Sequence, residues 1–494
     1  MVCRIFSKDD QMPQRQLPTD IYMNPLCERY AGREMLFLFS NDYKFTTWRK
    51  LWIALAECEM ELGLSITRAQ IDEMKTHLRD IDYDAVARYE ADTRHDVMAH
   101  IHAYGDLCPS ARPIIHLGAT SAFVGDNTDL VQMREACVML LCRLSAVIRA
   151  LRKFALEYRD LATLGFTHFQ PAQLTTVGKR ACLWLVDLQM DFEAIEQFVR
   201  WVPFLGVKGT TGTQASFLAL FNGDNAKAKK LDEMVSARMG FQRILPVTGQ
   251  TYTRKIDAMA LSILSGLAQS FHKMANDIRL LQSLKEIEEP FEKGQVGSSA
   301  MAYKRNPMRS ERLTSLSRFI MSLAQSPAMT AAEQWFERTL DDSANKRMSI
   351  PEAFLSADAC CIIAANICEG LVVYPRVIES RIRAELPFMA TENILMAAVT
   401  RGGDRQALHE RIRGHSMEAA KKIKLEGAAN DLLDRIAGDP AFGISRADLD
   451  KVLNNQDFVG RAPEQTAEFI EQHIDPLLKR AGEYGTIAMP DLRV

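Results

Sequence analysis

Apolar residues recur every seven positions through two long stretches of the chain. One stretch follows Asp126-Asn127, a favourable helix N-cap, and the other runs from Lys255 to Glu289. In each, two heptad series run side by side, as in helices that pack along a shared seam. The series are Leu130, Cys137, Leu144, Leu151 and Tyr158 beside Met133, Leu140, Val147 and Phe154, and then Ala260, Leu267, Met274 and Leu281 beside Leu264, Phe271 and Ile278. The pattern predicts two helices much longer than the usual three turns, and therefore a helical bundle.

Shorter helical patterns cover residues 175–199, 307–323 and 350–373, and continuous strand alternation is scarce, so the predicted fold class is all-α. Breaks occur at Gly105–Pro113 and at Tyr374-Pro375, because proline disfavours helix in the residue before it. We predict three mainly helical domains, at residues 1–112, 113–374 and 375–494, and the last has a fresh helix start at Ser445 with Asp448 as its N3 residue. The long seams exceed what one subunit needs to bury, which predicts a multi-subunit helical core.

Charge and hydropathy narrow the classes of partner. The chain has 60 Lys and Arg residues against 63 Asp and Glu residues, a net charge of −3, without any run of five or six like charges. Neither nucleic acid nor a membrane surface is therefore expected as a partner. The apolar segment Ala258–Phe271 is too short to span a bilayer, and the charged N-terminus does not resemble a secretory signal.

The ten cysteines lack regular spacing, and most lie in apolar stretches that look helical. This distribution predicts reduced, buried thiols in a cytoplasmic protein rather than a disulfide framework. Neither a C-x-x-C nor an H-E-x-x-H spacing occurs, so no metal site is expected. The cysteines expected to be buried are Cys137, Cys142, Cys182, Cys360, Cys361 and Cys368.

Three polar segments interrupt the helical background. Residues 164–176 place His168 between Thr167 and Gln170, although a lone histidine is more often structural than catalytic. Residues 206–213 are rich in glycine and threonine but lack the order of a phosphate-binding P-loop, which favours a plain loop. Residues 294–312 combine a Gly-Ser-Ser stretch with Lys304 and Asn306 before a helix start, and thus offer a proton acceptor and anion stabilisers within one loop. A basic, solvated helix start would not explain the Gly-Ser-Ser stretch.

The run Gly297-Ser-Ser-Ala-Met-Ala-Tyr-Lys-Arg-Asn-Pro307 resembles the signature of the fumarase/aspartase superfamily, whose usual form is Gly-Ser-Ser-x-Met-Pro-x-Lys-x-Asn-Pro. Its continuation, Met-Arg-Ser-Glu-Arg312, resembles the branch that acts on succinylated purines. Ala302 stands where the superfamily usually has proline, which affects the order of the loop rather than its chemistry. Five more segments resemble the superfamily in the same order along the chain: residues 93–100, 117–121, 167–173, 208–216 and 338–343.

The resemblance implies a carbon-nitrogen lyase that eliminates fumarate from adenylosuccinate, giving AMP, and from succinylaminoimidazole carboxamide ribotide. A base must remove a proton next to a carboxylate, and an acid must protonate the departing nitrogen. By the resemblance, Ser298 is the base, His168 is the acid, Glu311 orients and charges that imidazole, Lys304 binds a succinyl carboxylate, and His95 is a second active-site histidine. Such an elimination requires neither a metal nor a redox cofactor.

The same resemblance implies the residues that bind substrate. Asn306, Thr120 and Ser121 would hold the succinyl carboxylates together with Lys304, while Thr167 and Gln250 position the substrate. The remaining members are the ribose-phosphate contacts and the neighbours of His95 and Glu311: Arg29, Tyr30, Arg94, Asp96, Arg312, Arg338, Ser343 and Arg347.

The family also implies a homotetramer whose active sites are shared between subunits. Two alternatives stay open at this stage. One is a sister activity on the same fold, such as that of argininosuccinate lyase or fumarase, which the wording around Lys304 disfavours. The other is a non-catalytic structural protein, because fold does not fix function. Retention of His168, Ser298, Lys304 and Glu311 together argues against a mere scaffold.

Overall fold

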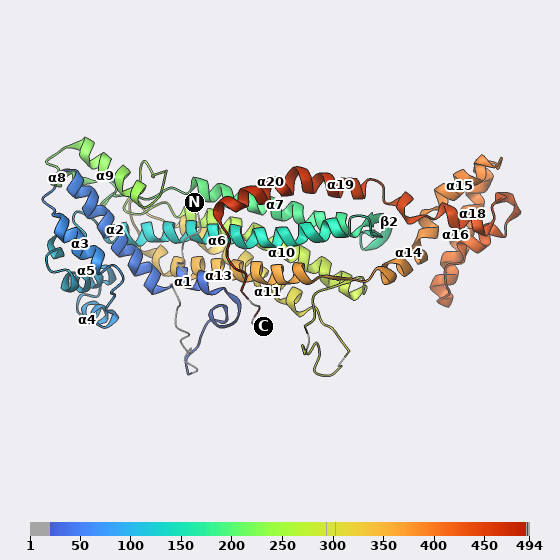
Figure 1. Ribbon diagram of the computed structural model, residues 1–494, viewed down its shortest axis with the longest axis horizontal. Helices are drawn as coiled ribbons and strands as arrows, with labels where there is room; N and C mark the ends of the chain where they lie inside the picture. Colours follow the sequence, from blue (N-terminus) through green and yellow to red (C-terminus); the bar gives the residue numbers. More distant parts are fainter. Residues whose placement is uncertain (1–19, 293, 302, 491, 493–494) are drawn as a thin grey trace.

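The computed structural model describes residues 20–292, 294–301, 303–490 and 492, so Ala302 lies outside the described residues. Helices make up 69% of the structure, which confirms the all-α prediction. The molecule is elongated, with long helices along its middle and a smaller helical group at each end (Figure 1).

Side-chain caps begin several helices of the first end group. The Ser40 hydroxyl accepts the Tyr43 amide at the start of one helix, and Thr67 with Gln70 forms a capping box at the start of another. Trp48 and Trp52 from the longest of these helices lie in the core that continues into the bundle. The elements are η1 (Leu26–Tyr30), α1 (Arg33–Leu38), α2 (Asn41–Glu61), α3 (Arg68–Thr76), α4 (Tyr83–Thr93), α5 (Asp96–Leu107) and η2 (Arg112–Ile114).

Five long helices form the middle of the molecule. Both heptad stretches are helical, and every residue of the four series is buried except Tyr158, which is half-buried and follows the end of its helix. The five helices are α6 (Ser121–Glu157), α7 (Val177–Trp201), α10 (Lys255–Ser283), α11 (Met308–Leu323) and α13 (Asp341–Gly370). Three shorter ones, α8 (Ala215–Leu220), α9 (Asn225–Arg238) and α12 (Gln325–Ala332), connect them.

The predicted start of the first long helix is wrong. The helix begins at Ser121, after Thr120, so Asp126 and Asn127 lie inside it and are buried. The Asn127 side chain donates to the Gly206 carbonyl at 3.0 Å and accepts the Gly206 amide at 3.1 Å. Its side-chain amide therefore forms hydrogen bonds with the backbone of a distant loop rather than capping the helix end.

The described residues also contain four short strands. β1 (Ala162–Thr167) and β2 (Gln170–Thr176) pair in an antiparallel hairpin, and β3 (Ile287–Glu288) pairs with β4 (Val372–Val373). The hairpin turns through His168 and Phe169, whose φ angles are 53° and 57°. Two-residue turns of this kind usually carry Asn-Gly, so no local signal in the sequence marks this turn.

The C-terminal elements build a separate small core and then return to the bundle. α14 (Pro375–Met389), α15 (Thr391–Thr400), α16 (Arg405–Glu426), α17 (Leu432–Ala437), η3 (Pro440–Phe442) and α18 (Arg446–Val452) surround that core, which includes Leu408 and Phe442. The predicted start at Ser445 is confirmed by a capping box with Asp448. η4 (Asn455–Phe458), α19 (Ala462–Phe469), η5 (Ile470–Ile474), α20 (Asp475–Ala481) and η6 (Gly482–Tyr484) follow, and Ile474 and Leu477 belong to the bundle core. The three domain boundaries stay a prediction.

Burial in the structure bears on the cysteines and on the most apolar helix. The six cysteines expected to be buried are buried and unbridged. In the described part of the chain, α13 alone is long and apolar enough to cross a membrane. Because 83% of its apolar window is buried inside the protein, it has the character of a core helix.

Gly178, in the first turn of α7, allows that helix to pack against the end of α6. A β-carbon at this position would collide with the Ala155 carbonyl and the Arg159 backbone, neither of which can yield like a flexible side chain. Gly178→Ala should therefore lower the unfolding free energy by about 1–3 kcal/mol, the usual cost of overpacking. Thermal and urea unfolding measure the effect. Gly125→Ala in α6, where no described atom lies within 4 Å, should instead stabilise by about 0.5–1 kcal/mol. Equal shifts in both variants would contradict this account.

Candidate active site

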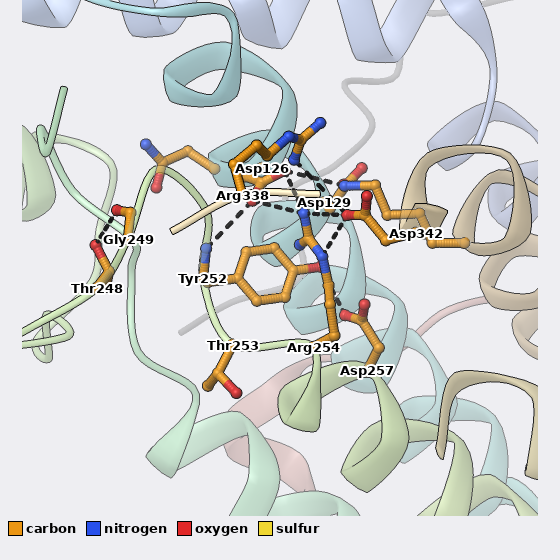
Figure 2. A network of polar contacts seen from close by, with 12 residues as sticks. Asp126, Asp129, Thr248, Gly249, Tyr252, Thr253, Arg254, Asp257, Arg338 and Asp342 are labelled. Atoms are coloured by element: carbon orange, nitrogen blue, oxygen red, sulfur yellow. Dashed lines mark hydrogen bonds and ion pairs between the residues drawn. The ribbon is translucent and has the colours of Figure 1, made fainter. Parts of the chain in front are cut away.

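Three of the long helices begin at the same end of the bundle. Asp126 in α6, Arg254 at the N-cap of α10 and Asp342 in α13 lie in one polar network, so the first turns of these helices are neighbours (Figure 2). Helix N-termini carry partial positive charge and unpaired amides. This end of the bundle therefore favours anions.

Arg254 is the centre of that network and is only 1% exposed. Its guanidinium donates to Asp342 at 2.5 Å and to Asp126 at 3.1 Å, and it lies 4.3 Å from the Tyr252 ring centroid. Lys346 adds a second cation, 3.0 Å from Asp126 and 2.6 Å from Asp129. Figure 2 shows these side chains converging from three helices and one loop.

The acids of this network differ in protonation behaviour. Burial opposes the ionisation of Asp126, but Lys346 and Arg254 outweigh it and hold its pKa below the usual value. Asp257 is also buried and accepts a 2.6 Å hydrogen bond from the Tyr252 hydroxyl, yet burial dominates and raises its pKa to about 7. The network thus keeps its central carboxylate charged, while Asp257 is partly protonated near neutral pH.

The network gathers many of the predicted substrate-binding residues. Arg338 lies 3.7 Å from Asp342, and Arg347 lies 3.3 Å from Asp96. The Gln250 amide donates to the Glu337 carbonyl at 2.9 Å, which joins the loop before α10 to the segment before α13. Together the bonds bring one set of predicted residues to this end of the bundle: Arg94, His95, Asp96, Thr120, Ser121, Gln250, Arg338, Ser343 and Arg347.

Two histidines here have different roles. The His95 ring accepts the Met98 amide through Nδ1 at 3.3 Å and so caps α5. His116, which sequence reasoning missed, accepts the Trp52 indole N–H through Nδ1 at 2.8 Å. Burial lowers the pKa of His116 to about 4, so it is neutral at pH 7. His95 is exposed and therefore accessible to a ligand.

The backbone around the candidate site is unusually strained. Arg94, His116, Gln214 and Phe336 have φ angles between 45° and 68°, where residues other than glycine are uncommon. Arg94 lies two residues before Asp96, which pairs with Arg347, and Phe336 lies next to Glu337, which accepts the Gln250 amide. Strained residues of this kind persist only where surrounding contacts fix them, and they concentrate at functional sites.

The loop that contains Ser298 is anchored at both ends. Before it, the buried Glu289 carboxylate accepts the Arg309 and Ser310 amides at 2.9 Å and so caps α11. Within it, Asn306 donates to the Gly297 carbonyl at 2.7 Å, and a β-carbon on Gly297 would collide with the Lys304 carbonyl. Glu289 was not singled out from the sequence, because a capping residue so far from its helix has no local pattern.

Ser298 lies half-buried in this loop. Its hydroxyl oxygen accepts the Met301 amide at 3.1 Å and the Ala300 amide at 3.4 Å. Donors aimed at an oxygen favour negative charge on it, which suits a proton acceptor. The Lys304 side chain is exposed in the same loop and adds a positive charge.

The other predicted residues lie on the β1–β2 hairpin, on α11 and on η1. Thr167 and His168 are exposed at the hairpin tip, and in the described residues neither a hydrogen bond nor an ion pair joins His168 to Glu311, which is exposed in the first turn of α11. Arg29 and Tyr30 lie on η1, where the Arg312 guanidinium stands 5.9 Å from the Tyr30 ring centroid. The predicted general acid and the carboxylate predicted to orient it are therefore not joined within the described part of one chain.

The length of the bundle separates the two halves of the candidate site. α10 begins at the Arg254 network and ends just before β3 and the Ser298 loop, and its 29 residues span roughly 43 Å. α6 begins at Ser121 and ends before the His168 hairpin, and its 37 residues span roughly 55 Å. One chain therefore places Ser298 and His168 far from Arg338 and His95.

Comparison with known proteins identifies the family. A family profile described as "Lyase" matches residues 38–322, and one described as "Adenylosuccinate lyase C-terminus" matches residues 387–469. Adenylosuccinate lyase from Saccharomyces cerevisiae is 54% identical over 469 residues, covering 94% of this chain and 97% of that protein. The chain belongs to the adenylosuccinate lyase family. The Schizosaccharomyces pombe adenylosuccinate lyase is 52% identical, over 92% of this chain and 95% of its own length.

Solved structures agree on the fold of this adenylosuccinate lyase family member. The 3-carboxy-cis,cis-muconate lactonizing enzyme from Pseudomonas putida superposes with a TM-score of 0.78 at 20% identity, covering 92% of this chain and 99% of that one. A fumarate lyase from Mesorhizobium gives a TM-score of 0.73 at 20% identity, covering 91% and 98%. At this identity the likeness concerns the fold alone.

Metal-ligand geometry is not evident in the described ranges, where no group of three or more His, Cys, Asp or Glu side chains could hold an ion. The acidic residues at the candidate site pair with Arg254 and Lys346 instead. The prediction that the chain uses neither metal nor cofactor stays a prediction.

The Arg254 network should contribute strongly to stability. Asp342→Ala leaves a buried guanidinium with one of its two carboxylates, and removing one partner of a buried pair typically costs about 3–5 kcal/mol. We expect a loss of that order in urea unfolding. The matched control is Asp450→Ala, which breaks an exposed pair with Arg446 in α18 and should cost under about 1 kcal/mol. Similar losses in both variants would remove the network from its proposed structural role.

Proposed function

We propose that this member of the adenylosuccinate lyase family eliminates fumarate from adenylosuccinate, giving AMP, and from succinylaminoimidazole carboxamide ribotide. Family membership supports the substrate class. The observation that carries the chemistry is the Ser298 loop, in which two amides polarise the hydroxyl and Lys304 stands nearby in sequence. Such a loop can accept a proton and stabilise the negative charge that follows.

In the proposed mechanism, Ser298 takes the proton from the carbon next to a succinyl carboxylate. The electron pair left behind first enlarges the charge on that carboxylate, which Lys304, Asn306 and the hydroxyls of Thr120 and Ser121 stabilise. The pair then forms the carbon-carbon double bond of fumarate while the carbon-nitrogen bond breaks. His168 gives its proton to the departing nitrogen, with Glu311 holding the imidazole.

We further propose that the active site is assembled between subunits of a homotetramer. Antiparallel neighbours would bring the Ser298 and His168 end of one chain to the Arg338 and His95 end of another, because each long helix separates these ends. Exposed apolar side chains on the sides of the long helices support contact between copies. They include Leu183, Val186 and Met190 on α7 and Met259 and Leu280 on α10.

The cytoplasm is the proposed location of the enzyme. Free, buried thiols are typical of proteins from reducing compartments, and the substrates proposed here are soluble nucleotides. No nucleic acid or membrane partner is proposed, because the net charge is small and like charges do not form runs.

Turnover should require both proposed proton-transfer groups. Ultraviolet absorbance of purified protein with adenylosuccinate should report formation of AMP, and argininosuccinate should not be cleaved. Ser298→Ala and His168→Ala should each lower kcat by about 10²- to 10⁴-fold, because an assisted proton transfer contributes that much, with little change in substrate Kd. Ser299→Ala is the matched control and should retain near wild-type turnover.

An analogue with a better leaving group separates the two roles. It needs little protonation, so it should restore turnover in His168→Ala but not in Ser298→Ala. Equal restoration in both variants would assign the base role to another group, such as His95.

Shared active sites should allow inactive variants to complement each other. In hybrids of Arg338→Ala and Ser298→Ala chains, random assembly should leave about a quarter of the sites with both wild-type groups. We therefore expect mixed, reassembled samples to recover up to about a quarter of wild-type kcat, with light scattering reporting a tetramer. Hybrids of Ser298→Ala with Lys304→Ala, which alter the same loop, should recover none if one chain supplies that loop to each site. A monomer in solution, or no recovery in the first mixture, would refute the shared site.

A further inference from the structure

The C-terminal helices enclose a cavity that the catalytic proposal does not use. It measures about 460 Å³ and lies between the end of α14, the start of α15 and one face of α16. Its apolar lining comes from Phe388, Leu395 and Ile412, and the last two are only 4% and 6% exposed. A cavity of this size can hold a small organic molecule with a flat apolar part.

One wall of the cavity is cationic. Arg405, His409 and Arg413 line it from successive turns of α16, because residues four apart share a helix face. Arg413 pairs with Glu410, whereas in the described part of the chain neither the Arg405 nor the His409 side chain makes a hydrogen bond or an ion pair. Glu392 is the single carboxylate of the lining.

On the adjoining face of α16, basic side chains pair with a carboxylate of the protein. There Arg411 and His415 both bind Asp439, at 3.0 Å each, which leaves little capacity for a ligand. The same helix thus carries one pair of basic residues with a carboxylate supplied by the protein and one row that faces an open cavity. Fold stability alone does not require the second row.

Ser416 gives an independent indication of a ligand. Its hydroxyl is buried, lines the cavity, and has no hydrogen-bond partner among the described residues. Leaving a buried polar group unpaired costs about 1–3 kcal/mol, and a serine inside a helix usually avoids this by bonding to the preceding turn. The hydroxyl lies one turn beyond Arg413, so an anion on the cationic wall could reach it.

We propose that this cavity binds a phosphomonoester with a flat apolar body, the chemistry of a nucleoside monophosphate. Arg405, His409, Arg413 and the Ser416 hydroxyl would hold the phosphate, since charge-assisted hydrogen bonds from arginine suit its oxygens. Phe388, Leu395 and Ile412 would cover the flat body, and Glu392 would accept from a hydroxyl group. The site lies in the C-terminal core cluster, apart from the Arg254 network and from the Ser298 loop (Figure 1).

Equilibrium dialysis of the full-length protein with AMP tests the proposal. The catalytic site and the cavity should together bind two AMP per chain, and the Arg405→Ala/Arg413→Ala variant should bind one at the same concentrations. Each lost arginine contact should raise the Kd of the cavity by about tenfold or more, because a hydrogen bond to a charged group is worth about 1.5–3 kcal/mol. Arg411→Ala, on the matched face, should bind as the wild type does.

Further samples separate this site from the catalytic one. Arg338→Ala should lose the catalytic AMP and keep the one in the cavity, and adenosine without phosphate should not bind the cavity. His409→Gln provides a milder second variant, in which the cavity Kd should also rise. Should the proposed function fail, the wild type would bind a single AMP that disappears in the Arg405→Ala/Arg413→Ala variant. The cavity proposal is overturned if binding is unaffected by Arg405→Ala/Arg413→Ala and His409→Gln, or if all of it disappears in Arg338→Ala.

Discussion

The burial of Arg254 is the constraint on which the rest of this structure depends. A guanidinium that is 1% exposed is stable only if carboxylates meet it with good geometry, and Asp126 and Asp342 reach it from two different helices. That requirement fixes the relative registers of α6, α10 and α13 at their first turns. Lys346 and Asp129 extend the same constraint by one more turn of α13 and α6. Gln250 and Arg338 lie in the loops just before α10 and α13, and Arg347 lies inside α13, so their positions follow.

The long helices then determine which predicted site residues one chain can bring together. They place the anion-favouring end of the bundle and the two segments that carry Ser298 and His168, the predicted base and acid, tens of ångströms apart, at opposite ends of a continuous core. A rigid separation of this kind makes each end a partial site with its own supporting contacts. Arg254 organises one end, and Glu289, through its bonds to the start of α11, organises the other. The side-chain positions at each end are therefore fixed by local contacts and do not depend on the distance between the two ends.

The sequence predicted the long helices because their apolar residues recur with regular heptad spacing. The predictions failed where contacts between residues far apart in the sequence determine the structure. Asp126 and Asn127 look like a helix cap. In the structure Asp126 binds Arg254, 128 positions away, and the Asn127 side chain donates to the Gly206 carbonyl. The hairpin escaped notice because its strands are rich in threonine and glutamine and its turn uses His168-Phe169. The pairing of Arg254 with Asp342, 88 positions apart, leaves no local trace. The site residues were predicted by resemblance alone, and their roles stay predictions, because in one chain Ser298 and His168 lie a helix length away from Arg338 and His95.

The path of the C-terminal chain has a mechanical consequence. The cluster around Leu408 and Phe442 is joined to the bundle twice, through α14 where the chain enters and through η4 and α19 where it leaves. A body held at two points can turn about the line that connects them but cannot swing freely in other directions. Rotation of the cluster would therefore follow a single axis, the line through these two connections. Cutting the chain in either connection would release that restriction while leaving the small core around Leu408 intact.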